Sequence, residues 1–359
     1  MKRLIYIYWL IGGFIGSISL ACVDQIELDV DPEENPEVIV VDGLITPGEG
    51  PYEIRIFKTA ARGSQLNEAV SVREAKVEDD LGNSELLFEK EPGVYELRGE
   101  TIRGEIGRSY TLSFTLVDGS RYRSKPEKLL PVSEIDTMNY EVDFAEIIDE
   151  TGQITAKTFV FFSADLNLTS LPESPLMRWE VSRWWGIVEV PKPIGLTKIC
   201  YINDPPARDG IQLFDGRGSD QSQWKNQPVG ALPIDFRFFQ KNVITVYLYS
   251  LTSEAFRYWD RVDRVVDQTG TIFDSPPAAV QGNVFNEDRP FEPVMGYFGA
   301  SAVDSFFFPI FRQDLSMFQN IQWFCDKPEL ALFYGRLSPC IDCLVIPNSQ
   351  VERPYFFDL

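Results

Sequence analysis

The chain has 359 residues, with 33 basic and 54 acidic side chains and a formal net charge of −21 at pH 7. Such an acidic surface repels phosphate backbones and anionic lipids, so nucleic acid is not expected as a partner. The chain contains no histidine, which excludes Ser-His-Asp and Cys-His catalysis and removes the commonest zinc ligand. A hydrophobic content of 44% indicates a folded protein, and the length favours two domains.

The N-terminal 22 residues predict an export signal with a lipidation site. Lys2 and Arg3 precede an apolar run that extends to Leu20 and is followed by Ala21 and Cys22. The cations are expected to stay on the cytoplasmic side while the apolar run enters the translocon. The segment 19–22 resembles a bacterial lipobox, although Ser19 stands where leucine is preferred. We therefore expect residues 1–21 to be a lipoprotein signal peptide and Cys22 to carry the lipid.

The alternative for this stretch is a retained membrane helix. Seventeen apolar residues could just span a bilayer, but Gly12, Gly13 and Gly16 weaken such a helix. Residues 22–36 are then expected to form an acidic tether, with Pro32 and Pro36 and the acids Asp24, Glu27, Asp29, Asp31, Glu33 and Glu34. Acids close behind the lipidated cysteine resemble the surface-export signal of Bacteroidota lipoproteins. A cell-surface position is favoured over a periplasmic one.

Short alternating segments separated by glycine-rich turns predict a β-sandwich over residues 37–130. Residues 52–57, for example, alternate apolar with charged side chains, as expected for a strand with one buried face. The expected strands lie at 38–45, 52–57, 75–78, 85–88, 94–97, 110–116 and 122–124. This number of short strands favours an immunoglobulin-like or transthyretin-like sandwich.

Residues 131–359 are expected to form a larger, β-rich C-terminal domain after a joint near residues 126–134. Strands are expected at 135–144, 154–164, 236–239 and 243–250. The main helix is expected near 253–268, because the segment Thr252, Ser253 and Glu254 offers a capping residue followed by an acid and Gly270 suits the helix end. Its apolar stripe, which includes Tyr258 and Trp259, predicts packing against a sheet.

Four further cysteines, Cys200, Cys325, Cys340 and Cys343, are disulfide candidates in an oxidising compartment. They allow three pairings, and the sequence does not select one. The Cys340–Cys343 spacing also fits half of a zinc site or a redox pair. Structural disulfides are favoured over both, since a zinc site would need Cys200 and Cys325 to converge on the pair and no thioredoxin-like βαβ unit surrounds it. No metal and no cofactor is expected.

Trp184 and Trp185 are candidate ligand-binding aromatics, because tryptophan next to arginine can stack on sugars or aromatic ligands. The alternative is that they fill a β core. No catalytic residue can be selected among so many acids, and the chain is not expected to be an enzyme. A glycoside hydrolase built on two carboxylates remains a minor alternative.

Several segments in order resemble the domain-of-unknown-function family 4249 of Bacteroidota. They are residues 38–45, 93–95, 107–112, 255–259, 272–277, 282–283, 296–301, 340–343 and 353–356. The family pattern tends to end in tryptophan where this chain has Phe357. The resemblance implies an outer-membrane lipoprotein encoded beside a TonB-dependent transporter, with no catalytic residues to carry over.

The leading hypothesis is therefore an accessory lipoprotein of the outer membrane. It would capture ligand for, or dock on, a TonB-dependent transporter barrel of the Sus type in nutrient uptake. Such a role needs binding without chemistry. The alternative is a stand-alone carbohydrate-binding or adhesive surface module that uses Trp184 and Trp185.

Overall fold

The structure is a computed structural model that describes residues 37–59, 68–148, 152–169, 171, 175–190, 197–204, 211–217, 222–267, 280–315, 321–323, 325, 332–333 and 336–358. The expected signal peptide, Cys22 and the acidic tether lie outside these residues. None of the helices in the described part of the chain is long and apolar enough to cross a membrane. The fold is mostly β, as the sequence predicts.

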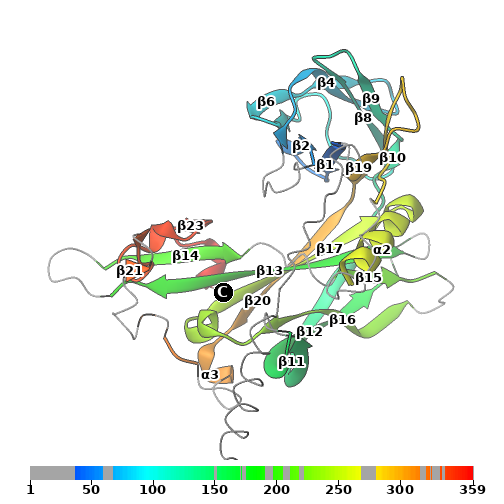
Figure 1. The fold of residues 1–359 in the computed structure, drawn as a ribbon. Coiled ribbons are helices and arrows are strands. Elements are labelled where there is room, and N and C mark those ends of the chain that lie inside the picture. The colour runs from blue at the N-terminus through cyan, green and yellow to red at the C-terminus, as the bar shows by residue number, and fades with distance from the viewer. Residues whose placement is uncertain are drawn as a thin grey trace, which may run out of the picture. The chain divides into compact units, whose positions relative to one another are not determined.

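The N-terminal part is a sandwich of two sheets (Figure 1). The first sheet contains β1 (Ile39–Ile45), β2 (Tyr52–Lys58), β3 (Glu68–Ala69), β6 (Phe88–Glu91), β7 (Val94–Leu97) and β19 (Val294–Ala300). The second contains β4 (Val72–Asp79), β5 (Ser84–Leu86), β8 (Ser109–Leu116), β9 (Arg121–Ser124), β10 (Glu127–Lys128) and β18 (Val284–Asn286). Alternate side chains of β2 are buried, as the period-2 pattern predicts for a strand with one face in the core.

Two strands of the sandwich come from the C-terminal half of the chain. β19 pairs in parallel with β1, from Ile39 opposite Val294 to Ile45 opposite Ala300. β18 pairs with β9 and forms the end strand of the second sheet. Val294 and Phe298 of β19 are fully buried in the sandwich core. A division of the chain at residue 130 therefore leaves out two strands of the first domain. The pairing of β1 with β19 joins segments about 250 residues apart, which local sequence patterns do not reveal.

Gly282 allows the backbone beside β19 to approach closely. A Cβ atom at this position would lie 1.5 Å from the carbonyl oxygen of Gly296, a backbone atom that can move only together with β19. We expect Gly282→Ala to displace β19 and to lower the free energy of unfolding by roughly 3 kcal/mol. Urea denaturation checks this, with Gly186→Ala in β13 as control, since a Cβ there meets nothing nearer than 3.9 Å. Equal stability of the two variants would contradict the expectation.

The C-terminal part has two further sheets that pack face to face. One contains β11 (Glu134–Ile148), β12 (Ile154–Asn167) and β16 (Gln223–Pro233). The other contains β13 (Leu176–Val188), β14 (Ile199–Asp204), β15 (Gln212–Asp215), β17 (Asn242–Leu251), β20 (Val303–Ile310) and β23 (Ser349–Gln350). Their shared core includes Val160 and Phe162 of the first sheet with Met177 and Leu248 of the second.

The remaining described elements are short, except for one helix. They are the strands β21 (Leu332–Phe333) and β22 (Arg336–Leu337), the helix α3 (Arg312–Leu315), and the 3-10 helices η2 (Phe236–Phe239), η5 (Cys343–Val345) and η6 (Tyr355–Asp358). The expected strand at 236–239 is wrong. The Asp235 side chain accepts a hydrogen bond from the Arg237 amide and so caps η2, a local bond that competes with strand pairing.

The main helix is α2 (Ser253–Asp267), close to the predicted range. The hydroxyl of Thr252 caps it by accepting a hydrogen bond from the Ala255 amide at 3.1 Å. The apolar stripe of α2, including Tyr258, packs with Leu176, Leu251 and Tyr297. The helix therefore covers β13, β15 and β17 and also contacts β19 (Figure 1). The predicted packing role of this stripe is confirmed.

Candidate binding pocket at the joint between the two parts

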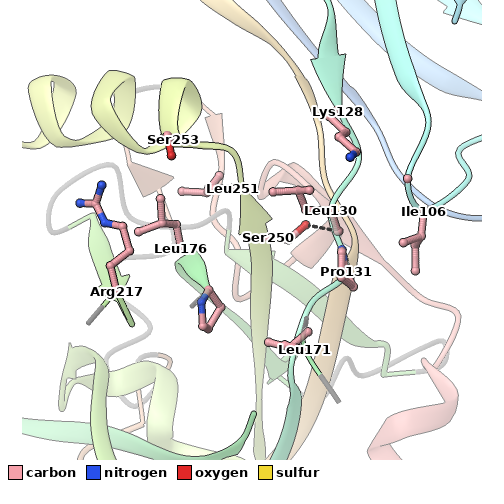
Figure 2. Close-up of a pocket in the computed structure, with 12 residues that line it drawn as sticks. Ile106, Lys128, Leu130, Pro131, Leu171, Leu176, Arg217, Ser250, Leu251 and Ser253 are labelled. Carbon is pink, nitrogen blue, oxygen red and sulfur yellow. Dashed lines mark hydrogen bonds between the residues drawn. The ribbon is translucent and has the colours of Figure 1, made fainter. Parts of the chain in front are cut away.

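A pocket of about 710 Å³ lies where the sandwich meets the C-terminal part (Figure 2). The sandwich side contributes Ile106, Gly107 and Lys128, and the connecting segment contributes Leu130 and Pro131. The C-terminal side contributes Leu171, Pro175, Leu176, Arg217, Ser250, Leu251 and Ser253. A mostly apolar lining with a few polar groups, at a domain joint and in this size range, is typical of small-molecule sites.

The connecting segment behind the pocket is fixed by hydrogen bonds. The Ser250 hydroxyl donates to the Leu130 carbonyl oxygen at 2.6 Å, drawn as a dashed line in Figure 2. The same hydroxyl accepts from the Ala302 amide at 2.9 Å. Ser250 is buried, so these bonds form without competition from solvent. The pocket wall at Leu130 is consequently held in one position relative to β17 and β20.

The charged side chains of the lining are both cations. Lys128 and Arg217 lie on opposite sides of the pocket (Figure 2). Arg217 is oriented by Asp215, with 2.6 Å between Nη2 and Oδ2, and its guanidinium lies 5.5 Å from the centre of the Phe256 ring. Because Asp215 already neutralises Arg217, the charge of Lys128 is the one that favours an anionic group on the bound molecule.

A buried carboxyl group lies next to Lys128 in sequence. Glu127 is 2% exposed, and its oxygens lie 2.6 Å from the Thr252 hydroxyl and 2.8 Å from the Tyr297 hydroxyl. Burial raises the pKa of Glu127 to about 7. This one side chain thus joins β10, the N-terminus of α2 and β19 behind the pocket. No sequence pattern distinguishes Glu127, because a single glutamate in a segment between two prolines carries no signal of its own.

The two candidate tryptophans lie elsewhere and do not line the pocket. Trp184 is partly exposed and packs edge-to-face on Phe356, with ring centres 5.4 Å apart. Trp185 is 5% exposed, and its indole N–H donates to Asp204 at 2.9 Å. Trp184 therefore belongs to an aromatic cluster at the C-terminus of the chain, whereas Trp185 faces a small core around the cysteines.

The four cysteines form two disulfides, which confirms their expected structural use. Cys200 bonds to Cys343, and Cys325 bonds to Cys340. All four are buried, and they pack with Trp185, Ile187 and Ile202. The Cys340–Cys343 spacing thus belongs to two separate disulfides. In the described part of the chain, no group of three or more cysteine and carboxylate side chains is arranged to hold a metal ion.

The fold defines a class of protein: a mostly β, disulfide-bonded protein with a candidate binding pocket between its sandwich and its C-terminal sheets. Residues 23–306 match the family described as "Domain of unknown function (DUF4249)", and the chain belongs to this family. The resemblance noted in the sequence is thereby confirmed. No curated protein matches the sequence.

Proposed function

We propose that this protein is a lipid-anchored accessory protein of the outer membrane that captures a ligand for a TonB-dependent, Sus-type transporter in nutrient uptake. The N-terminal signal ending at Cys22 supports the anchor. The two disulfides support an oxidising location outside the cytoplasm. The protein binds its ligand without chemical change and delivers it to the barrel.

The joint pocket is the observation that carries the proposal. Its apolar walls and the Lys128 ammonium group suit an amphiphilic molecule with an anionic group. Its walls come from both the sandwich and the C-terminal part, so a partner that contacts either part can influence the site. This supports a protein that holds a ligand and releases it on contact with a partner.

Purification of the tagged full-length protein from outer membranes in mild detergent tests the transporter partnership. A large barrel protein of the TonB-dependent class is expected to co-purify in a fixed ratio. Recovery of the protein in the outer-membrane fraction without any large barrel protein contradicts the proposed partnership.

Charge reversal at Lys128 is expected to weaken binding of an anionic amphiphile in the pocket. The probe is 8-anilinonaphthalene-1-sulfonate, whose fluorescence rises in apolar sites. For Lys128→Glu we expect its affinity to fall about tenfold, since one cation beside the sulfonate is exchanged for an anion. The control is Lys90→Glu, which makes the same change of charge on the exposed strand β6. An equal loss in both variants would indicate a long-range effect of net charge and would contradict a local site.

The second candidate function is a carbohydrate-binding or adhesive surface module. The partly exposed Trp184 and the 71% exposed Tyr355 favour it, since both belong to the aromatic cluster around Phe356. Quenching of tryptophan fluorescence by a glycan panel, in a preparation that contains no transporter, distinguishes this function from the first. Loss of the quenching in Trp184→Ala would assign it to this cluster.

A further inference from the structure

The long hairpin formed by β11 and β12 extends past the sheet to which it belongs. β12 pairs with β16 only as far as Phe159, opposite Pro233. β11 and β12 continue to pair with each other up to Ile148 opposite Ile154. We call the two-stranded end, residues 144–148 and 154–158, the arm. Two-stranded ribbons of this kind have little stability of their own in water.

The arm continues the core-facing side of the hairpin into solvent. Residues directly opposite each other share a face, and alternate residues along a strand share it as well. By this register Phe144, Ile148 and Ile154 lie on the same face as Val160 and Phe162. Val160 and Phe162 are buried in the core. In the arm, the side chains are 65% exposed for Phe144, 72% for Ile148 and 70% for Ile154.

None of the residues that the structure describes covers this apolar face. The charge of the arm indicates which kind of partner is suited to cover it. Glu146 lies on this face, between Phe144 and Ile148, whereas Asp143 and Lys157 lie on the opposite face of the hairpin. A second copy of this acidic chain, an anionic lipid surface and the acidic segment 22–36 are all repelled by such a site. A protein surface with an apolar groove rimmed by lysine or arginine is complementary to the arm in apolar character and in charge.

We propose that the arm is a docking element that inserts Phe144, Ile148 and Ile154 into an apolar groove with a cationic rim on a partner protein. The inference deepens the proposed function. It rests on that function in one respect only, which is that the partner protein is the transporter. Binding buries three large apolar side chains, the kind of anchor found at the energetic centres of protein interfaces. The Glu146 carboxylate lies on the same face, so the partner must present a lysine or arginine to pair with it.

Photocrosslinking in cells of the native host tests the proposal. A benzophenone amino acid replaces Phe144 or Ile148 in the full-length chain, and in control chains it replaces Leu81 or Val117. These controls are 73% and 69% exposed in the sandwich, so their exposure matches that of the arm. We expect both arm positions to crosslink to the same protein, in a peptide rich in lysine or arginine, and the controls not to do so. The substitution Ile154→Glu should lower the yield about tenfold.

Adducts only with copies of this chain or with lipid, or equal adducts from the control positions, overturn the proposal. A cationic partner that is not a barrel supports the arm as a docking element and contradicts the transporter. A co-purifying barrel that crosslinks to the controls and not to the arm supports the transporter and contradicts the arm.

The double variant Phe144→Ser with Ile148→Ser separates docking from folding. Because both side chains are exposed, we expect its thermal unfolding midpoint to match that of the wild type within a few degrees, while co-purification of the partner is lost. A strongly lowered midpoint would show that this face is covered within the chain itself and would overturn the proposal.

Discussion

Replacement of both Cys200 and Cys343 by serine is expected to lower the free energy of unfolding by about 5 kcal/mol, the larger of the two disulfide effects. The bond closes a loop with a sequence separation of 143 residues, so its loss restores much conformational entropy to the unfolded chain. Both cysteines are replaced together because a single substitution would leave a free thiol. Urea denaturation followed by tryptophan fluorescence measures the change, since Trp185 packs in the same cluster.

The double substitution Cys325→Ser with Cys340→Ser is the matched control. Its disulfide lies in the same cluster but has a sequence separation of only 15 residues. The expected loss is about 3 kcal/mol, because a shorter loop restricts the unfolded chain less. If removal of the short-loop disulfide lowers the free energy of unfolding more than removal of the long-loop disulfide, the stabilisation does not originate in loop entropy.

Replacement of Glu127 by glutamine is expected to remove a pH dependence of stability. The carboxyl has a pKa of about 7 in the folded protein against an ordinary value of 4.5. Between these values the unfolded chain releases the proton while the folded chain keeps it, so stability falls as pH rises through this window. Below it the carboxyl is protonated in both states and has no such effect. The wild type should therefore lose roughly 2–3 kcal/mol between pH 5 and pH 8 from this group.

The Glu127→Gln variant keeps the shape of the side chain and partners for Thr252 and Tyr297, but it does not ionise. Unfolding free energies of both proteins at pH 5 and pH 8 isolate the effect, because all other titrating groups are common to the two. The free energy of unfolding of the variant should increase relative to that of the wild type as pH rises. Curves that run parallel across this range would show that the Glu127 carboxyl titrates normally in the folded protein.

The parts of the fold that depend on local patterns were predictable. The alternation in β2 and the capping side chain before α2 act within a few residues, so the sequence displays them directly. The pairing of β1 with β19 was not predictable, because it joins distant segments through backbone hydrogen bonds that carry no side-chain signature. The disulfide pairing was equally open, since any two of four cysteines satisfy the same chemistry.

The candidate site was less predictable than the fold. The joint pocket is built from single residues of both parts, such as Ile106, Leu176 and Ser253, and none of them belongs to a motif. Glu127 is distinguished only by its burial, which depends on the packing of β10, α2 and β19 around it. Trp185, in contrast, was conspicuous by residue type, yet the structure places it in a small core.

The most direct test of the whole account is the intact mass of the protein recovered from the outer-membrane fraction of its native host. An anchored binding protein predicts a chain that begins at Cys22 and carries additional mass from a diacylglyceryl group and an N-terminal acyl chain. A chain that retains an unmodified Met1, or one that is absent from the outer membrane, would contradict it.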